Sequence, residues 1–283
     1  MNKIGFNVLA WSANMSDELK PILDRLKKIG YDGAEFFVGS PNEAAYKNVG
    51  NYCREIGLEV TTVSVLSPEE NLISADAAIR QKGLEKIKWI IDRSHDLGSQ
   101  VLCGPNHSAF ATFSKAAPQE VEYDRSAEML HQAGDYAAQA GMIITPEALN
   151  RFECYLCNTM EQLGHLLSKV NHPNVKAMFD THHANMEEKK LGDAIRSIGS
   201  RLAHFHISEN DRGTPGSGHV PWDETFAALA EIQYKGWLTI EGFTRNDPDF
   251  ANSIGVWRQF SEPWDMAENG FIHIKKMMAK HGL

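Results

Sequence analysis

An eightfold alternation of short strand-like runs and longer helix-like runs is the feature that most constrains how this chain can fold. Runs rich in β-branched and aromatic residues predict strands at 4–9, 33–38, 59–65, 100–104, 142–147, 175–180, 202–207 and 237–241. Because strands that alternate with long helices form parallel βαβ units, the pattern predicts a parallel sheet. Eight such units in 283 residues match the usual size of one closed barrel. We therefore predict an α/β fold, a single (β/α)8 TIM barrel, with residues 1–283 as one catalytic domain.

The helices between the strands are predicted from apolar residues at helical spacing and from residues that favour helix ends. Gly30, Gly57, Gly98, Gly141 and Gly199 each follow a helical pattern, as glycine commonly does just past a helix C-terminus. The predicted helices cover residues 16–29, 43–56, 75–97, 122–140, 159–170, 187–198, 223–232 and 262–280. No linker or low-complexity tract interrupts the series, which favours one domain over two.

Charge, hydropathy and cysteine usage limit the partners and the compartment. A formal net charge of −9 repels a phosphate backbone, so we expect no nucleic-acid partner. No run approaches the roughly 20 apolar residues of a membrane-spanning helix. The first residues also lack the apolar core of a signal peptide, so we expect a cytoplasmic protein without a membrane partner. Cys154 and Cys157 have no second close pair with which to build a zinc ribbon, and all four cysteines are expected to be reduced thiols.

Four consecutive predicted strands carry an ionisable side chain at or near their C-terminal ends. The fifth, sixth and eighth strands end at Glu147, Asp180 and Glu241, and the seventh carries His204 and His206. Because barrel enzymes place their chemistry at the C-terminal ends of the strands, these side chains should converge. Converging carboxylates repel one another strongly unless a cation neutralises them. We therefore predict one divalent metal ion per subunit, with Glu147, Asp180, His206 and Glu241 as its ligands.

The ligand types indicate which metal fits. Three carboxylates and one imidazole form a hard, oxygen-rich set, which suits Mn²⁺ first and Co²⁺ or Mg²⁺ next, better than a structural zinc. His206 lies nearer the C-terminal end of its strand and is the predicted ligand. His204 points to the same face, either as a hydrogen-bonded histidine of the barrel interior or as a support for the metal ligand. The glycine-rich run 213–218 is either a flexible active-site lid or an ordinary surface loop.

Five ordered motifs carry a resemblance to a known family. They are Pro-Glu-Ala-Leu-Asn-Arg-Phe-Glu from position 146, Phe-Asp-Thr-His-His-Ala-Asn from 179, His-Phe-His-Ile-Ser-Glu-Asn-Asp-Arg from 204, Gly-Ser-Gly-His-Val-Pro-Trp-Asp from 216 and Ile-Glu-Gly-Phe from 240. Together they resemble the ketose 3-epimerases, that is the D-tagatose, D-psicose (D-allulose) and L-ribulose 3-epimerases of the xylose-isomerase-like barrel superfamily. The resemblance extends over the whole chain.

This resemblance implies an isomerase that inverts C3 of a free ketohexose or ketopentose through a cis-enediolate. It implies Glu147, Asp180, His206 and Glu241 as metal ligands, Glu147 and Glu241 as the acid/base pair, and Glu153, His183 and Arg212 as sugar-binding residues. It also implies a homodimer or a homotetramer. Trp257 and Trp264 are then either subunit contacts or residues that pack the last loop on the barrel.

Several alternatives stay open at the level of sequence. An aldose–ketose isomerase would move a proton between C1 and C2 on the same barrel, and a sugar-phosphate epimerase would need an additional basic pocket. An endonuclease IV-like nuclease would need more metal-binding histidines and a basic surface. A non-catalytic sugar-binding barrel should have lost one of the two glutamates. Asn7 and the run 103–110 depart from the family pattern, and we expect them to shape the far end of the sugar pocket.

Overall fold

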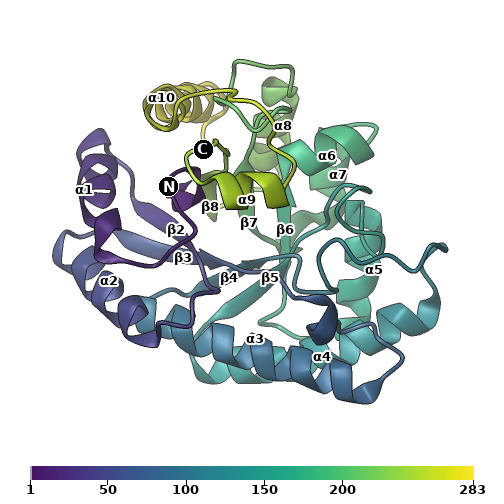
Figure 1. Ribbon diagram of the computed structural model, residues 1–283. Helices are drawn as coiled ribbons and strands as arrows, with labels where there is room; N and C mark the ends of the chain where they lie inside the picture. Colours follow the sequence, from purple (N-terminus) through teal and green to yellow (C-terminus); the bar gives the residue numbers. More distant parts are fainter. Residues whose placement is uncertain (1) are drawn as a thin grey trace.

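Eight parallel strands lie at the centre of the structure, a computed structural model that describes residues 2–283 (Figure 1). They are β1 (Lys3–Asn7), β2 (Gly33–Phe37), β3 (Glu59–Val63), β4 (Val101–Gly104), β5 (Ile143–Pro146), β6 (Ala177–Asp180), β7 (Leu202–Ile207) and β8 (Trp237–Ile240). Their order in the sheet is β5-β4-β3-β2-β1-β8-β7-β6, so β1 pairs with both β2 and β8. Parallel bridges from Ile144 to Val175 and from Glu147 to Met178 bring the two outer strands together. The predicted (β/α)8 barrel is confirmed.

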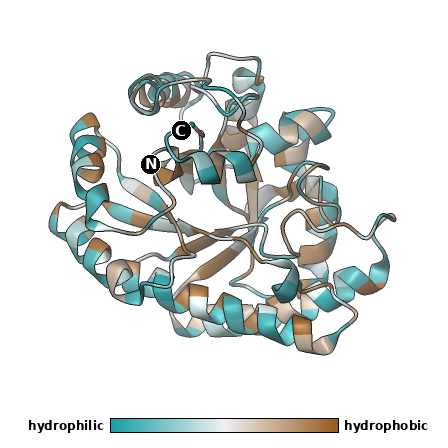
Figure 2. Ribbon diagram, viewed as in Figure 1, coloured by the Kyte–Doolittle hydropathy of each residue, from teal (hydrophilic) through white to brown (hydrophobic). Residues whose placement is uncertain are grey.

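The long helices surround this sheet and turn their apolar faces toward it (Figure 2). They are α1 (Lys20–Ile29), α2 (Glu43–Glu55), α3 (Ala77–Leu97), α4 (Glu120–Gln139), α5 (Met160–Val170), α7 (Leu191–Ile198), α8 (Trp222–Glu231) and α10 (Pro263–His281). In α3, Leu84, Ile87 and Ile91 recur at spacings of three and four residues and are buried. This periodicity explains why the helices could be predicted from the sequence.

The structure also contains elements that the sequence did not predict. Two short helices, α6 (Thr181–Glu187) and α9 (Pro248–Ser253), follow β6 and β8. The predicted helix 187–198 begins later, at Leu191, because the chain around Glu188 and Lys190 is extended. Four 3₁₀ turns complete the fold: η1 (Val8–Ala10), η2 (Asp17–Leu19), η3 (Pro68–Glu70) and η4 (Gly199–Arg201).

Alternate residues of the strands divide between two environments. Phe6, Phe36, Phe179 and Phe205 are fully buried in the apolar core that the helices complete, and the last two rings stack with centroids 5.1 Å apart. Other strand residues face the barrel interior, where several side chains are polar and also buried: Asn7, Glu35, Thr61, His204, His206 and Thr239. Because successive strand residues point to opposite faces, a polar interior can coexist with an apolar outer layer.

Two further sequence expectations concern single residues and membrane contact. Trp264 packs against Trp11, with ring centroids 4.6 Å apart, and against the Arg25 guanidinium, whereas Trp257 is 73% exposed. Trp264 therefore packs the last segment on the barrel. Among the helices of residues 2–283, none combines the length and the apolar character needed to cross a membrane.

Gly83 provides a test of how tightly α3 packs. Helix propensity alone would make Gly83→Ala stabilising by about 1 kcal/mol, but here an added Cβ would overlap the backbone carbonyl oxygen of Glu70. Because overpacking costs about 1–3 kcal/mol, we expect this substitution to lower the free energy of unfolding. Gly164→Ala in α5 is the matched control, since its nearest neighbour is the flexible end of Arg201 at 2.9 Å. Urea unfolding of both variants checks the prediction, and a Gly83→Ala variant as stable as the control would contradict it.

Candidate metal centre and active site

A cavity of about 1060 Å³ opens at the C-terminal ends of the strands. One side of it is lined by charged and polar residues, including Glu147, His183, Arg212 and Glu241. The remaining wall is largely apolar. Such a cavity at this end of a barrel, apolar with a few convergent polar groups, is the usual arrangement of a small-molecule site.

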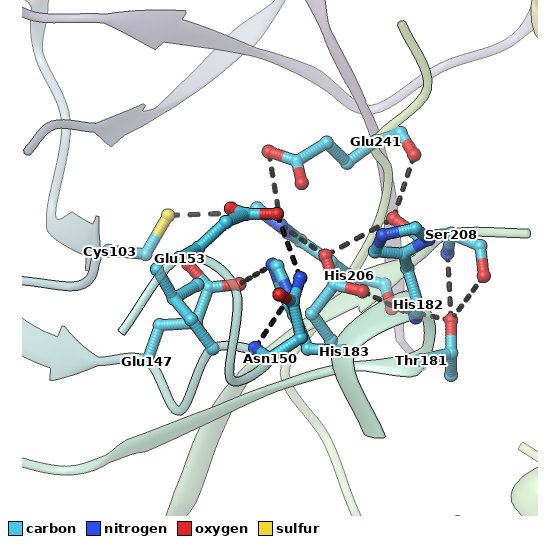
Figure 3. Close-up of polar contacts among 12 residues, drawn as sticks. Cys103, Glu147, Asn150, Glu153, Thr181, His182, His183, His206, Ser208 and Glu241 are labelled. Carbon is cyan, nitrogen blue, oxygen red and sulfur yellow. Dashed lines mark hydrogen bonds and ion pairs between the residues drawn. The ribbon is translucent and has the colours of Figure 1, made fainter. Parts of the chain in front are cut away.

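The four predicted metal ligands converge at the base of this cavity. Figure 3 labels three of them, Glu147, His206 and Glu241. Glu147 follows β5, Asp180 ends β6, His206 lies near the end of β7 and Glu241 follows β8. All four side chains are buried, and each offers one ligand atom within 4.8 Å of the other three. The Nδ1 atom of His206 lies 3.4 Å from Oε1 of Glu241 and 3.6 Å from Oδ2 of Asp180. Nδ1 is therefore the histidine atom that faces the carboxylates.

Two buried polar atoms in this cluster have no hydrogen-bond partner among residues 2–283. They are Oε1 of Glu147 and Nδ1 of His206. Buried polar atoms in proteins are nearly always paired, so unpaired ones need a physical reason. A cation between Glu147, His206, Asp180 and Glu241 would supply the missing partner of both atoms. The residues present therefore fit a divalent ion, and the donor set of three carboxylates and one imidazole fits Mn²⁺, Co²⁺ or Mg²⁺.

The protonation of the cluster reflects its excess of negative charge. Burial raises the pKa of Glu147 well above its usual range, and the charges of Asp180 and Glu241 raise it further. Burial alone would lower the pKa of His206, but Glu241 and Glu35 outweigh it and the pKa lies well above the usual value. Burial would likewise raise the pKa of Asp180, but Arg212 outweighs it and that pKa lies well below its usual range. Without a cation, protons on Glu147 and His206 therefore reduce the repulsion.

Arg212 supplies the permanent positive charge of the site. Its Nη1 donates to Oδ2 of Asp180 at 2.8 Å and to Oε2 of Glu241 at 2.7 Å, and its guanidinium lies 4.8 Å from the ring centroid of Phe243. The backbone of Arg212 has a φ of +64°, which is unfavourable for a residue with a side chain. Hydrogen bonds from its own N–H to Glu209 and from Phe243 to its carbonyl hold this conformation. Strained backbone of this kind occurs where a side chain must be aimed at a functional site.

The predicted sugar-binding residues Glu153, His183 and Arg212 all line the cavity. His183 belongs to α6, and the side chain of Asp180 caps that helix by accepting from the backbone N–H of His182. Nδ1 of His183 accepts from the backbone N–H of Asn150, and Nε2 lies 2.9 Å from Nη2 of Arg212. The Asn150 amide also donates to Glu153 at 2.8 Å. The metal-ligand cluster and the predicted sugar-binding residues thus form one connected site.

Glu35 is a site residue that the sequence did not reveal. It lies within β2, is fully buried, and accepts a hydrogen bond from Nε2 of His206 at 2.7 Å and one from the Thr61 hydroxyl at 2.9 Å. Oε2 of Glu35, which accepts from Thr61, also lies 2.8 Å from Nε2 of His204, so His204 lies beside Glu35 in the barrel interior. Burial alone would raise the pKa of Glu35, but His206 and His204 outweigh it and the pKa lies well below the usual value. A lone acid inside a strongly buried strand was the available sequence signal.

The glycine-rich run 213–218 is tied down instead of lying over the cavity. The buried carboxylate of Glu209 accepts hydrogen bonds from the backbone N–H groups of Gly216 and Val220 and from the Trp222 indole. None of the residues 213–218 lines the cavity. The lid interpretation of this run is therefore wrong in this structure.

The segment after β8 lines the cavity, whereas residues 213–218 do not. Residues Phe250, Ile254, Val256 and Phe260, on α9 and the chain that follows it, line the apolar wall of the cavity. The ring centroid of Phe250 in α9 lies 5.2 Å from that of Phe243, which follows β8 (α9 and β8 are labelled in Figure 1). This segment completes the pocket around whatever binds at the metal-ligand cluster.

Comparison with known proteins agrees with this arrangement. Residues 23–281 match the model of the xylose isomerase-like TIM barrel family. A D-psicose 3-epimerase from Agrobacterium fabrum is 32% identical over 94% of this chain and 93% of the relative, and an L-ribulose 3-epimerase from Methylomonas sp. is 32% identical over 96% of each. The crystal structure of a D-allulose 3-epimerase from Methylomonas sp. in complex with D-allulose superimposes with a TM-score of 0.91 at 30% identity, covering 98% of this chain and 97% of that one.

The chain therefore belongs to the ketose 3-epimerases of the xylose isomerase-like TIM-barrel family. It is an isomerase of the epimerase type. The resemblance that the five motifs predicted is confirmed.

The raised pKa values of Glu147 and His206 predict how divalent metal binding depends on pH. Both groups must lose a proton before they can bind a cation, so affinity for Mn²⁺ should rise with pH. Each displaced proton raises the affinity for Mn²⁺ by up to about tenfold per pH unit while the pH is below the pKa of that group. Mn²⁺ titrations across the neutral range, in buffers of different ionisation enthalpy, measure both the affinity and the protons released. An affinity that is constant with pH would contradict the prediction.

Proposed function

We propose that this chain inverts the configuration at C3 of a free ketose with the help of one divalent cation held by Glu147, Asp180, His206 and Glu241. The convergence of these four side chains within 4.8 Å is the observation that carries the proposal. A bound divalent cation, with Mn²⁺ as the first choice and Co²⁺ or Mg²⁺ as alternatives, supplies Lewis acidity that makes the C3–H bond acidic. The remaining chemistry falls to the side chains of the protein.

Glu147 and Glu241 are the proposed acid/base pair. They follow β5 and β8, which are not neighbours in the sheet, so their carboxyl groups approach the cavity from different sides. One removes the proton from C3 on one face, and the other returns a proton on the opposite face of the cis-enediolate, with the roles exchanged in the reverse direction.

Arg212, His183 and Glu153 are the proposed sugar-binding residues. The planar fork of Arg212 can orient oxygen atoms and offset negative charge that develops on the substrate. Burial lowers the pKa of His183 and Arg212 lowers it further, so its imidazole is neutral and can exchange hydrogen bonds with a hydroxyl group. Fixed positions of this kind account for several kcal/mol of the barrier in many enzymes.

A free ketohexose or ketopentose fits the cavity better than a phosphorylated sugar. Relatives named for D-psicose and L-ribulose support a free ketose. The cavity lining includes Arg212 and Arg258, but the Arg212 guanidinium is already engaged by carboxylates of the site. Asp247 and Asp249 lie in the same lining and would repel a phosphate group. The epimerase relatives likewise favour C3 inversion over the aldose–ketose isomerisation and the nuclease alternatives.

The homodimer or homotetramer implied by the resemblance is also proposed for this chain. Phe152 and Trp257 are 74% and 73% exposed, and large apolar side chains of this kind are candidate subunit contacts. Sedimentation velocity gives the mass of the assembly directly. A monomer at micromolar concentration would contradict the proposal.

Proton exchange at C3 tests the acid/base pair. In D₂O the native enzyme should place deuterium at C3 of the ketose during turnover. We expect Glu147→Gln and Glu241→Gln each to lower the rate of epimerisation by at least about 100-fold, since general acid/base groups contribute roughly 10²–10⁴. NMR of the C3 signal measures exchange and epimerisation together.

A matched control for these variants is Glu187→Gln. Glu187 lies close in sequence to the site residues but pairs with Arg151 outside the metal-ligand cluster. This variant should epimerise at close to the native rate. Native rates of C3–H exchange in either Glu147→Gln or Glu241→Gln would show that the two-base scheme is wrong.

The choice of substrate is tested by a panel of ketohexoses, ketopentoses and their terminal phosphates. Because acidic side chains line the cavity, kcat/KM should be higher for each free sugar than for its phosphate. Chromatography of the products distinguishes a C3 epimer from an aldose. Faster turnover of the phosphates, or aldose as the main product, would favour the corresponding alternative.

A further inference from the structure

Asn7 connects two carboxylates from neighbouring strands. It ends β1, which pairs with β2 on one side and with β8 on the other. Its Nδ2 donates to Oε1 of Glu35 at 3.0 Å and to Oε1 of Glu241 at 3.1 Å. The side chain is fully buried, so water does not compete for these hydrogen bonds.

The orientation of the Asn7 amide follows from its backbone contact. Its Oδ1 accepts a hydrogen bond from the backbone N–H of Leu9 at 3.0 Å. A flipped amide would point its NH₂ group at that N–H and its oxygen at two carboxylates, losing all three hydrogen bonds. The donor side of Asn7 is therefore fixed toward Glu35 and Glu241.

Glu35 determines which nitrogen of His206 is free to bind a cation. Nε2 of His206 donates to Oε1 of Glu35 at 2.7 Å, the same oxygen that accepts from Asn7. Nδ1 faces Asp180 and Glu241 without a hydrogen-bond partner of its own among residues 2–283. When a cation displaces the proton from Nδ1, Glu35 keeps the remaining proton on Nε2, and the neutral ring presents its Nδ1 lone pair to the cation. Metal-binding histidines commonly have such a carboxylate on their second nitrogen, which fixes ring and tautomer.

We propose that Asn7 and Glu35 are positioning residues of the metal centre. Together they hold Nδ1 of His206 and the carboxylate of Glu241 in the geometry that a divalent cation requires. The Asn7 amide contacts Glu241 directly and His206 through Glu35, so removing the amide disturbs both predicted ligands. The inference rests on the proposed function in one respect, the divalent cation at the four ligands. The contact with Glu241 also places Asn7 at the metal end of the site. The sequence had suggested a place at the far end of the sugar pocket.

A second arrangement of the same side chains has to be distinguished from this one. Glu35, Cys103, His204 and His206 also offer ligand atoms within 4.8 Å of one another and could hold a thiophilic metal. The two oxygens of Glu35, however, already accept hydrogen bonds from Asn7, His206 and Thr61. The Cys103 thiol lies 3.4 Å from Glu35, and burial raises its pKa well above the usual value. Hydrogen bonds therefore account for the contacts of Glu35 without a second cation.

The test compares Mn²⁺ binding by the native protein and by Asn7→Leu, Glu35→Leu and Glu35→Gln. Leucine keeps the branched shape of Asn7 and is similar in length to Glu35 without their hydrogen bonds, whereas glutamine keeps one acceptor oxygen for His206. Loss of such outer support typically weakens metal affinity by about 10–100-fold. We expect losses of that size for Asn7→Leu and Glu35→Leu and a smaller loss for Glu35→Gln. Free Mn²⁺ measured by electron paramagnetic resonance gives the affinity and the number of ions bound.

A matched control separates positioning from general destabilisation. Thr62→Val in β3 removes buried hydrogen bonds to Ser94 and Val101 that do not contact the metal-ligand cluster. It should lower thermal stability but leave Mn²⁺ affinity unchanged. At saturating Mn²⁺, Asn7→Leu should lower kcat more than it changes the KM for the ketose, because Glu241 is misplaced while the sugar-binding residues are intact.

Three results would overturn the inference. One is native Mn²⁺ affinity in both leucine variants, and another is an equal loss of affinity in Thr62→Val. The third is a second equivalent of bound metal that disappears in Cys103→Ala, which would assign the interior group to a cation. A native protein that binds Mn²⁺ in the expected way but does not epimerise ketoses would instead contradict the proposed function alone. If native protein binds no divalent cation, both fail.

Discussion

Repulsion between three buried carboxylates is the constraint on which the rest of this site depends. Glu147, Asp180 and Glu241 are all nearly inaccessible to solvent, and burying like charges together is costly unless positive charge or protons offset them. In this structure the offset comes from Arg212 and from the raised pKa values of Glu147 and His206. A divalent cation is the agent that can offset all three carboxylates at once. The same repulsion that favours a cation also raises the pKa of Glu147 and of His206.

The barrel makes this convergence unavoidable. Strands β5 to β8 end at the same rim, so one ionisable residue on each strand is enough to build the cluster. Short elements then orient the side chains that contact this cluster. Asp180 caps α6 and thereby fixes His183, and the strained backbone of Arg212 directs its guanidinium at Asp180 and Glu241. Behind the cluster, Glu35 and Asn7 set the position of two proposed ligands from the barrel interior.

The parts that could be predicted from sequence are those with a local signal. Strand periodicity, helix amphipathicity and glycine at helix ends predicted the barrel, and an acid or histidine at each strand end predicted which four side chains lie together. Glu35 had only the weak signal of a lone acid inside a buried strand, and the sequence did not show the contacts of Asn7, because both residues depend on partners across the barrel. His206 lies 171 residues from Glu35 and Glu241 lies 234 residues from Asn7. Helices α6 and α9 were missed because seven and six residues are too few to show a helical period. The glycine-rich run suggested a mobile lid, since nothing local showed that Glu209 would bind its backbone.

The position of the cation itself is the most direct measure of this interpretation. Crystals grown with Mn²⁺ and measured at its absorption edge give an anomalous peak at each bound ion. We expect one peak per subunit, in contact with Glu147, Asp180, Glu241 and Nδ1 of His206. A peak at Nε2 of His206 beside Glu35, or no peak at the four side chains at saturating Mn²⁺, would contradict it.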